Sequence, residues 1–240
     1  MAAMLEVVGA SKNFNGLRAV ADVSFAVPER AIFAVIGPNG AGKTTVFNLI
    51  AGMFAPNAGT ITFQGEQIDG MTPDEVCRRG IGRTFQIVRP FPALTVEDNV
   101  MVGALLRHGD PRQAMARAHD VLRRLDLYDK RRQLAGSLTL PDRKRLEVAR
   151  ALATEPKLLL LDEVMAGLRP TETDRMVEIL KELNAGGLTI LLIEHVMRAV
   201  MSLATRVLVL HHGAAIAEGS PVEVVRNPAV VQSYLGAEAL

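Results

Sequence analysis

The segment from Gly37 to Thr45 constrains the fold of this chain more than any other stretch of its sequence. It reads Gly-Pro-Asn-Gly-Ala-Gly-Lys-Thr-Thr and stands between apolar runs at residues 31–36 and 46–50. A strand, a glycine-rich turn and a helix therefore follow in the order that a phosphate-binding P-loop requires. Average residue usage gives the fixed positions of such a loop by chance in roughly one chain in a hundred of this length. We therefore predict a binding site for ATP or GTP here.

Each residue type in this loop has a chemical role toward a triphosphate. The glycines allow the backbone to wrap around the phosphates with its N–H groups pointing inward, and the helix that follows presents its positive end to the same anion. We predict that Lys43 reaches the β- and γ-phosphates and that the Thr44 hydroxyl binds Mg²⁺. The predicted nucleotide-binding residues of the loop are Gly37, Pro38, Asn39, Gly40, Ala41, Gly42, Lys43, Thr44 and Thr45.

Composition and charge narrow the class of protein. With 240 residues, 49% of them hydrophobic, the chain can bury a large core. Its formal net charge of +1 gives no broad basic field for nucleic acid. The basic segments 130–132 and 143–145 have no aromatic residues beside them and are expected to be solvated faces. No apolar run approaches the roughly 18 residues of a membrane span, so we expect any membrane role to depend on partner proteins.

The hydrophobic pattern predicts an α/β fold. Strands are expected at residues 5–8, 19–27, 59–63, 158–162, 188–193 and 206–210. The first three indicate a small antiparallel β subdomain, with residues 59–65 as an edge. The last three are buried strands that alternate with helices, which is typical of a mostly parallel sheet. Because residues 95–155 have a helical pattern, we expect a single domain over residues 1–240 with a helical subdomain at about 95–155.

Polar side chains follow two of the buried strands. Asp162 and Glu163 come after four leucines, and parallel sheets bind ligands at the carboxyl ends of their strands. Asp162 suits the Mg²⁺ shell, and Glu163 suits the activation of the attacking water as a general base. His195 follows the strand at 188–193, and its imidazole can hydrogen-bond a γ-phosphate oxygen. The Gln86 amide can coordinate Mg²⁺ or water.

In this order, the motifs resemble those of the ATP-binding cassette (ABC) ATPases over essentially the whole chain. The matching residues are Phe14 as the aromatic that stacks on adenine, Gly37 to Thr45 as Walker A, Gln86 as the Q-loop, Leu138 to Asp142 as the signature, Asp162 and Glu163 as Walker B, Ala166 to Arg169 as the D-loop, and His195 as the H-loop. The resemblance implies a P-loop NTPase fold with a RecA-like, mostly parallel sheet, and ATP with Mg²⁺ as the nucleotide. It also implies catalytic roles for Glu163, His195 and Gln86, Mg²⁺ coordination by Thr44, Gln86 and Asp162, and an ATP contact from Thr139.

Longer strings are similar to the ATPase subunits of branched-chain amino-acid importers. They lie at residues 80–86, 145–152, 166–172, 193–197 and 234–236. This resemblance implies a second ATPase subunit of a different chain, two transmembrane permease subunits and an extracytoplasmic solute-binding protein as partners. It also implies a peripheral location on the cytoplasmic face of the cell membrane. Two other classes remain open, a related ATPase that acts on nucleic acid or the ribosome, and a nucleotide-gated regulatory subunit that does not hydrolyse ATP.

The signature departs from the usual Leu-Ser-Gly-Gly-Gln of the family, because residues 138–142 read Leu-Thr-Leu-Pro-Asp. Pro141 removes a backbone donor, and Asp142 is expected to place a carboxylate where the γ-phosphate of a paired subunit should lie. Thr139 and Asp142 also have the spacing of a helix capping box. In the D-loop, Arg169 replaces the usual Asp or Asn. These departures predict a weak site at this signature and hence an asymmetric pair of ATPase subunits. The alternative that the sequence leaves open is that Thr139 and Asp142 merely stabilise the helix and that the ATP shifts slightly.

The segment at residues 87–94 reads Ile-Val-Arg-Pro-Phe-Pro-Ala-Leu and has neither a helical nor a strand period. Its apolar side chains, Val88 and Phe91 among them, favour an exposed groove for a short helix of the permease. A loop packed on the helical block is the alternative that the pattern leaves open.

Overall fold

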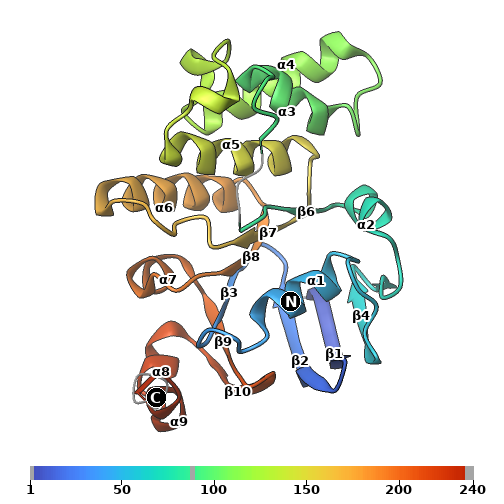
Figure 1. Cartoon of the computed structure of the whole chain (residues 1–240), viewed down its shortest axis with the longest axis vertical. Helices are drawn as coiled ribbons and strands as arrows, with labels where there is room; N and C mark the ends of the chain where they lie inside the picture. Colours follow the sequence, from blue (N-terminus) through green and yellow to red (C-terminus); the bar gives the residue numbers. More distant parts are fainter. Residues whose placement is uncertain (1–2, 87–89, 236–240) are drawn as a thin grey trace. The chain divides into compact units, whose positions relative to one another are not determined.

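The computed structural model describes residues 3–86 and 90–235, and the chain divides into two compact units. The first unit comprises residues 1–76 and 189–240, and the second comprises residues 77–188. Parallel and antiparallel strand pairs occur together with helices, so the predicted α/β class is confirmed (Figure 1). Within the described ranges, no helix combines the length and the apolar character needed to cross a lipid bilayer.

The first unit contains an antiparallel sheet. Its strands are β1 (Ala3–Phe14), β2 (Leu17–Pro28), β4 (Ala58–Phe63) and β5 (Glu66–Gln67), in the order β2-β1-β4-β5. The predicted antiparallel subdomain is therefore confirmed, but the prediction that residues 59–65 form its edge is wrong. β4 pairs with β1 along its length and with the two-residue β5 at Thr62 and Phe63, so β5 and β2 are the outer strands of this sheet.

The first unit also contains parallel strands. They are β3 (Ile32–Ile36), β8 (Thr189–Ile193) and β9 (Arg206–His211), with β10 (Ala214–Gly219) antiparallel to β9. β3 lies between β8 and β9 and is parallel to both. All residues of β3 and β8 are buried, as expected for strands covered on both faces. The helices of this unit are α1 (Lys43–Ile50), α7 (Met197–Leu203), α8 (Pro221–Val225) and α9 (Pro228–Leu235).

The second unit is mainly helical. Its elements are β6 (Ile81–Arg83), α3 (Val96–Ala104), α4 (Pro111–Arg124), the 3₁₀ turns η1 (Tyr128–Lys130) and η2 (Ala135–Ser137), α5 (Leu140–Ala153), β7 (Leu158–Asp162) and α6 (Pro170–Ala185). The short helix α2 (Pro73–Arg79) spans the division between the units. β6 and β7 pair in parallel, and α3 packs against both α4 and α5 (Figure 1). The predicted helical block at 95–155 coincides with α3 to α5.

Local sequence explains where these helices begin. The Thr95 hydroxyl accepts the Asp98 N–H at 3.1 Å before α3, and the Asp110 carboxylate accepts the Arg112 N–H at 2.9 Å before α4. Each bond satisfies one of the backbone donors that a helix start leaves open. The buried face of α4 consists of Ala114, Ala118, Val121 and Leu122.

Candidate nucleotide-binding site

The loop between β3 and α1 has the geometry of a phosphate-binding P-loop. Gly37 has φ 148°, and a Cβ atom at this position would lie 2.1 Å from the Leu210 carbonyl oxygen. Gly42 has φ 96°, and a Cβ atom there would lie 2.4 Å from the Ala19 carbonyl oxygen. Only glycine fits at both positions, because β9 and β2 approach the loop so closely.

Lys43 and Thr44 begin the helix that follows this loop. The Lys43 side chain is buried, and its ammonium donates to the Gly37 carbonyl at 2.7 Å and the Pro38 carbonyl at 2.9 Å. Thr44 is exposed. The first-turn N–H groups of α1 point toward the loop, as in every helix start. Backbone donors, an ammonium and a hydroxyl thus gather where the sequence predicts a triphosphate.

Two further predicted residues of the first unit stand at the ends of strands whose neighbours adjoin this loop. Val35 of β3 pairs with Ile193 of β8, and the strands are parallel, so the P-loop and the exposed His195 leave the sheet at the same edge. Phe14 ends β1, and the start of β2 approaches Gly42 through the Ala19 carbonyl. The Phe14 ring is 36% exposed and packs edge-on against Phe54, with 5.2 Å between ring centroids. An exposed aromatic held in this way can serve as a stacking platform.

The second unit holds the predicted carboxylates. Asp162 is buried at the end of β7, and its backbone N–H donates to the Thr84 hydroxyl at 3.0 Å. Its carboxylate forms an ion pair with Arg83 at 3.5 Å. Burial lowers the pKa of Arg83 below its ordinary value and the charge of Asp162 opposes this, but an arginine remains protonated. Sequence reasoning missed Arg83 because only the pairing of β6 with β7 brings it to Asp162.

Two predicted catalytic residues meet in the second unit. The Gln86 amide donates to a Glu163 carboxylate oxygen at 2.9 Å. Glu163 has φ 51°, a left-handed conformation directly after β7, and its carbonyl accepts the buried Lys144 ammonium at 2.8 Å. The bonds from Gln86 and Lys144 therefore hold both the side chain and the backbone of Glu163. Lys144 is part of the basic segment 143–145, so the expectation that this segment is a solvated face is wrong for that residue.

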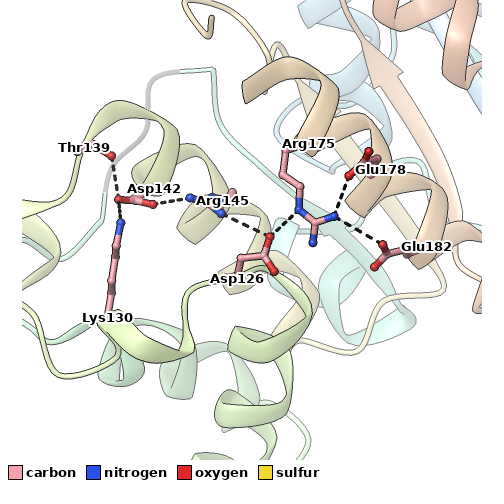
Figure 2. A network of polar contacts seen from close by, with 8 residues as sticks. All are labelled: Asp126, Lys130, Thr139, Asp142, Arg145, Arg175, Glu178 and Glu182. Atoms are coloured by element: carbon pink, nitrogen blue, oxygen red, sulfur yellow. Dashed lines mark hydrogen bonds and ion pairs between the residues drawn. The ribbon is translucent and has the colours of Figure 1, made fainter. Parts of the chain in front are cut away.

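The signature contains a chain of alternating charges, which Figure 2 shows. The Asp142 carboxylate accepts bonds from Lys130, Thr139 at 2.8 Å and Arg145 at 2.6 Å. Arg145 also lies 3.7 Å from Asp126, which pairs with Arg175 at 2.7 Å. Arg175 in turn contacts Glu178 and Glu182. The chain of contacts links the start of α5 to α6.

This network corrects two expectations about the signature. Asp142 is only 2% exposed and its charge is compensated by Lys130 and Arg145, so the expectation that it offers a free carboxylate to a γ-phosphate is wrong. The capping box is also wrong, because the Thr139 hydroxyl makes no bond to the helix backbone and donates to Asp142 instead. Burial alone would raise the pKa of Asp142, but bonds from Lys130 and Thr139 outweigh it and hold the pKa below its ordinary value.

The C-terminal helix α9 adds a feature that sequence reasoning did not assign. A groove of about 510 Å³ lies between the P-loop and α9. Its lining residues are Pro38, Asn39, Gly40, Ala41, His211, His212, Ile216, Ala229, Gln232 and Ser233. Burial raises the pKa of the Tyr234 phenol, and a hydrogen bond from the Gly37 backbone N–H opposes this rise. Tyr234, which the sequence singled out only for its resemblance, thus contacts the first glycine of the P-loop.

Val88 of the segment at residues 87–94 lies outside the described residues, which resume at residue 90. Asn99 of α3 holds the turn that runs from Phe91 to Thr95. Its carbonyl oxygen accepts the Phe91 N–H at 2.8 Å, and its amide donates to the Phe91 carbonyl at 3.0 Å and the Thr95 carbonyl at 2.9 Å. The backbone of this turn is packed on the helical block, while the Phe91 side chain is 44% exposed.

Each unit, taken by itself, carries donors of a kind that phosphates or hard cations prefer. The P-loop offers backbone N–H groups and an ammonium to phosphates, and Phe14 offers an aromatic face to a base. The Thr44 hydroxyl, the Asp162 carboxylate and the Gln86 amide are oxygen donors of the kind that Mg²⁺ prefers.

Comparisons with known proteins point the same way. A match to the ABC transporter family spans residues 20–166, and a match to the branched-chain amino acid ATP-binding cassette transporter family spans residues 216–239. The chain is 41% identical over 249 residues to the high-affinity branched-chain amino acid transport ATP-binding protein LivG of Salmonella typhimurium, with 97% of this chain and 98% of that protein covered. It is 39% identical over 250 residues to the corresponding protein BraF of Pseudomonas aeruginosa, with the same coverage of 97% and 98%.

A solved structure supports the same assignment. The crystal structure of MJ1267 in its ADP conformation, an ATP-binding cassette of an ABC transporter, is similar with a TM-score of 0.90 at 30% identity, covering 98% of this chain and all of that one. The first family match alone covers more than half of the 240 residues. This chain therefore belongs to the ABC transporter family, as one of its ATP-binding cassettes.

Proposed function

We propose that this chain is the ATP-hydrolysing subunit of an importer for branched-chain amino acids. The observation that carries the solute assignment is the match of residues 216–239 to the branched-chain amino acid cassette family, because Walker motifs occur in cassettes for every kind of solute. The LivG and BraF relatives, aligned over nearly the whole chain, support the same solute class.

In the proposed binding chemistry, Phe14 stacks on the adenine, residues 37–45 surround the phosphates, and Lys43 neutralises charge on the β- and γ-phosphates. Mg²⁺ would be held by Thr44, Gln86 and Asp162, and it would supply charge neutralisation between those phosphates. Thr139 of the signature would contact the ATP held by a paired subunit.

Hydrolysis would use Glu163 as the general base. Its carboxylate accepts a proton from the attacking water, and the bond from the Gln86 amide orients that carboxylate without neutralising it. His195 would orient the water and hydrogen-bond a γ-phosphate oxygen. ATP held between two cassettes stabilises their closed pair, and loss of the γ-phosphate releases it.

The partners follow from this role. They are a second ATPase subunit, two transmembrane permease subunits and, through these, an extracytoplasmic solute-binding protein. The chain would act peripherally on the cytoplasmic face of the membrane, bound to the permeases. A nucleic-acid or ribosome ATPase and a non-hydrolysing regulatory subunit are the competing functions.

A pair of substitutions tests the ATPase proposal. We expect Lys43→Ala to abolish tight ATP binding, because it removes a contact to the ground-state phosphates. We expect Glu163→Gln to retain ATP binding and trap an ATP-bound dimer, with turnover lowered about 10²- to 10⁴-fold. Nucleotide-binding and steady-state ATPase assays distinguish the two, and near-normal turnover in Glu163→Gln would remove this residue from its assigned role.

The solute is tested separately. With the permeases and the solute-binding protein reconstituted in lipid vesicles, the wild-type chain should support ATP-dependent uptake of leucine, isoleucine and valine. The Glu163→Gln variant is the matched control and should support none. ATP hydrolysis without uptake of these amino acids would leave the ATPase assignment standing and reject the solute class.

A further inference from the structure

Helix α9 packs through one face against β10 of the same unit. Val230 and Ser233 are buried, and Tyr234 lies on their side of the helix, because positions three and four apart are neighbours. The Ser233 hydroxyl donates to the Val230 carbonyl at 2.7 Å, so this buried group is satisfied within the helix. At the start of α9, the Asn227 side chain accepts the Ala229 N–H at 2.9 Å. The helix is thus capped at its start and packed along the face that carries Tyr234.

Tyr234 links this helix to the P-loop. Its phenol oxygen accepts the backbone N–H of Gly37, which is a buried residue. A buried backbone donor that loses its acceptor costs free energy comparable to a lost hydrogen bond. A phenylalanine at position 234 would bury the same ring but could not accept this bond. Packing alone therefore does not account for a tyrosine here.

Gly37 makes a second bond on its other side. Its carbonyl accepts the Lys43 ammonium at 2.7 Å, and its φ of 148° is a conformation that side-chain-bearing residues rarely adopt. The two polar groups of one glycine thus join Tyr234 to the lysine that is predicted to bind the β- and γ-phosphates. A shift of Tyr234 therefore acts on the residue that directs the Lys43 ammonium.

The rest of α9 faces the loop across the groove described above. Ala229, Gln232 and Ser233 line this groove from the helix, and residues 38–41 line it from the loop. With open space between these facing residues, the bond from Gly37 to Tyr234 supplies a direct link between helix and loop.

We infer that Tyr234 is a positioning residue for ATP binding, which holds the first glycine of the P-loop in its binding conformation from the C-terminal helix. This role rests on the proposed function, because it requires that the P-loop binds ATP. It also gives residues 216–239 a task in the ATPase cycle itself, beyond their use in assigning the solute. Because coupling between two equilibria is reciprocal, ATP binding must in turn stabilise the docked position of α9.

Equilibrium binding of a non-hydrolysable ATP analogue to the full chain tests this role. We expect Tyr234→Phe to weaken the affinity about tenfold, because the buried Gly37 donor loses its acceptor while the ring is kept. Tyr128→Phe makes the same chemical change at the other tyrosine of the sequence, in η1 of the second unit, and should bind as the wild type does. In the assembled transporter, the KM for ATP should rise by a similar factor in Tyr234→Phe, and kcat should change by less than about twofold.

Hydrogen exchange separates positioning from a general loss of fold. In Tyr234→Phe the Gly37 amide should exchange faster, while the amides of β3 keep their protection. In the wild type, the ATP analogue should slow exchange in α9, and this effect should be lost in Tyr234→Phe. Melting temperatures of both phenylalanine variants check that the fold is retained.

Two results would overturn the role of Tyr234 alone. One is an equal affinity for the analogue in Tyr234→Phe and Tyr128→Phe. The other is exchange in wild-type α9 that the bound analogue does not slow, a measurement that needs no variant and so stands even if Tyr234→Phe fails to fold. A wild-type chain that binds no ATP analogue would instead reject the proposed ATPase, and the role of Tyr234 with it.

Discussion

At the scale of single residues, the conformation of the P-loop requires a glycine at position 37. We expect Gly37→Ala to lower the melting temperature and to weaken ATP binding, because its Cβ would lie 2.1 Å from the Leu210 carbonyl oxygen. A backbone strained in this way costs on the order of 1–3 kcal/mol, before any displacement of the loop is counted.

Gly109→Ala is the matched control for this prediction. A Cβ atom there meets nothing within 4 Å. The melting temperature and the ATP affinity of both variants are measured by thermal unfolding and by equilibrium nucleotide binding. Equal melting temperatures and equal ATP affinities in the two would show that the approach of β9 does not constrain the loop.

The functional roles of residues could be predicted from the sequence where the residues lie within one short motif. The contacts between residues far apart in the sequence could not. Lys43 and Thr44 lie within one contiguous motif, so their place could be predicted from the sequence alone. The Gln86–Glu163 bond joins residues 77 positions apart and requires β6 to pair with β7. The burial of Asp142 was missed for the same reason, because Lys130 lies outside the signature motif.

At the scale of elements, the buried carboxylate at the start of α5 makes the helix sensitive to acid. The folded-state pKa of Asp142 is lowered, so its contribution to stability is present above the ordinary carboxyl pKa of about 3.9 and is lost as the pH falls through the folded value. We expect Asp142→Asn to cost about 1–3 kcal/mol at neutral pH, because bonds from Lys130 and Arg145 to a charged group are lost.

Denaturant unfolding of Asp142→Asn and of the wild type across the acidic range measures this effect. The difference in the free energy of unfolding should shrink as the wild-type carboxylate is protonated. A difference that stayed constant into strong acid would mean that the lost charge is not its source.

Strands with a strong hydrophobic pattern could be predicted from the sequence. Strands that form only because they pair with a neighbouring strand could not. β3, β7 and β8 are fully buried, are apolar except for Asp162 and Thr189, and lie at or near the predicted residues. β10 reads Ala-Ala-Ile-Ala-Glu-Gly, a composition with weak preference for strands, and it is a strand because it pairs with β9. β6 has three residues, too few for a period to appear.

At the scale of the whole molecule, the altered signature predicts an asymmetric transporter. Pro141 supplies no N–H near the start of α5, and the Thr139 hydroxyl is engaged with Asp142. A missing donor at the site completed by this signature would cost roughly 1–3 kcal/mol. We therefore expect low ATPase activity from the chain alone and one dominant hydrolytic site in a heterodimer, formed by Lys43, Glu163 and His195 of this chain.

Substituting each general base in turn tests the asymmetry. In the full transporter, Glu163→Gln should nearly silence ATP hydrolysis, whereas the equivalent change in the other ATPase subunit should leave substantial turnover. Equal losses from the two changes would reject the asymmetric arrangement.

The exposed ring of Phe91 marks a position where a fluorescent side chain can be introduced. The sequence contains no tryptophan, so Phe91→Trp would introduce a single fluorophore, on a turn whose backbone Asn99 holds in place. The emission of this tryptophan should shift to the blue when a nonpolar surface covers the indole. The Phe91→Trp variant would therefore report permease binding in real time, without a dye. An emission spectrum unchanged by permeases that demonstrably bind would mean that the ring still faces water in the complex.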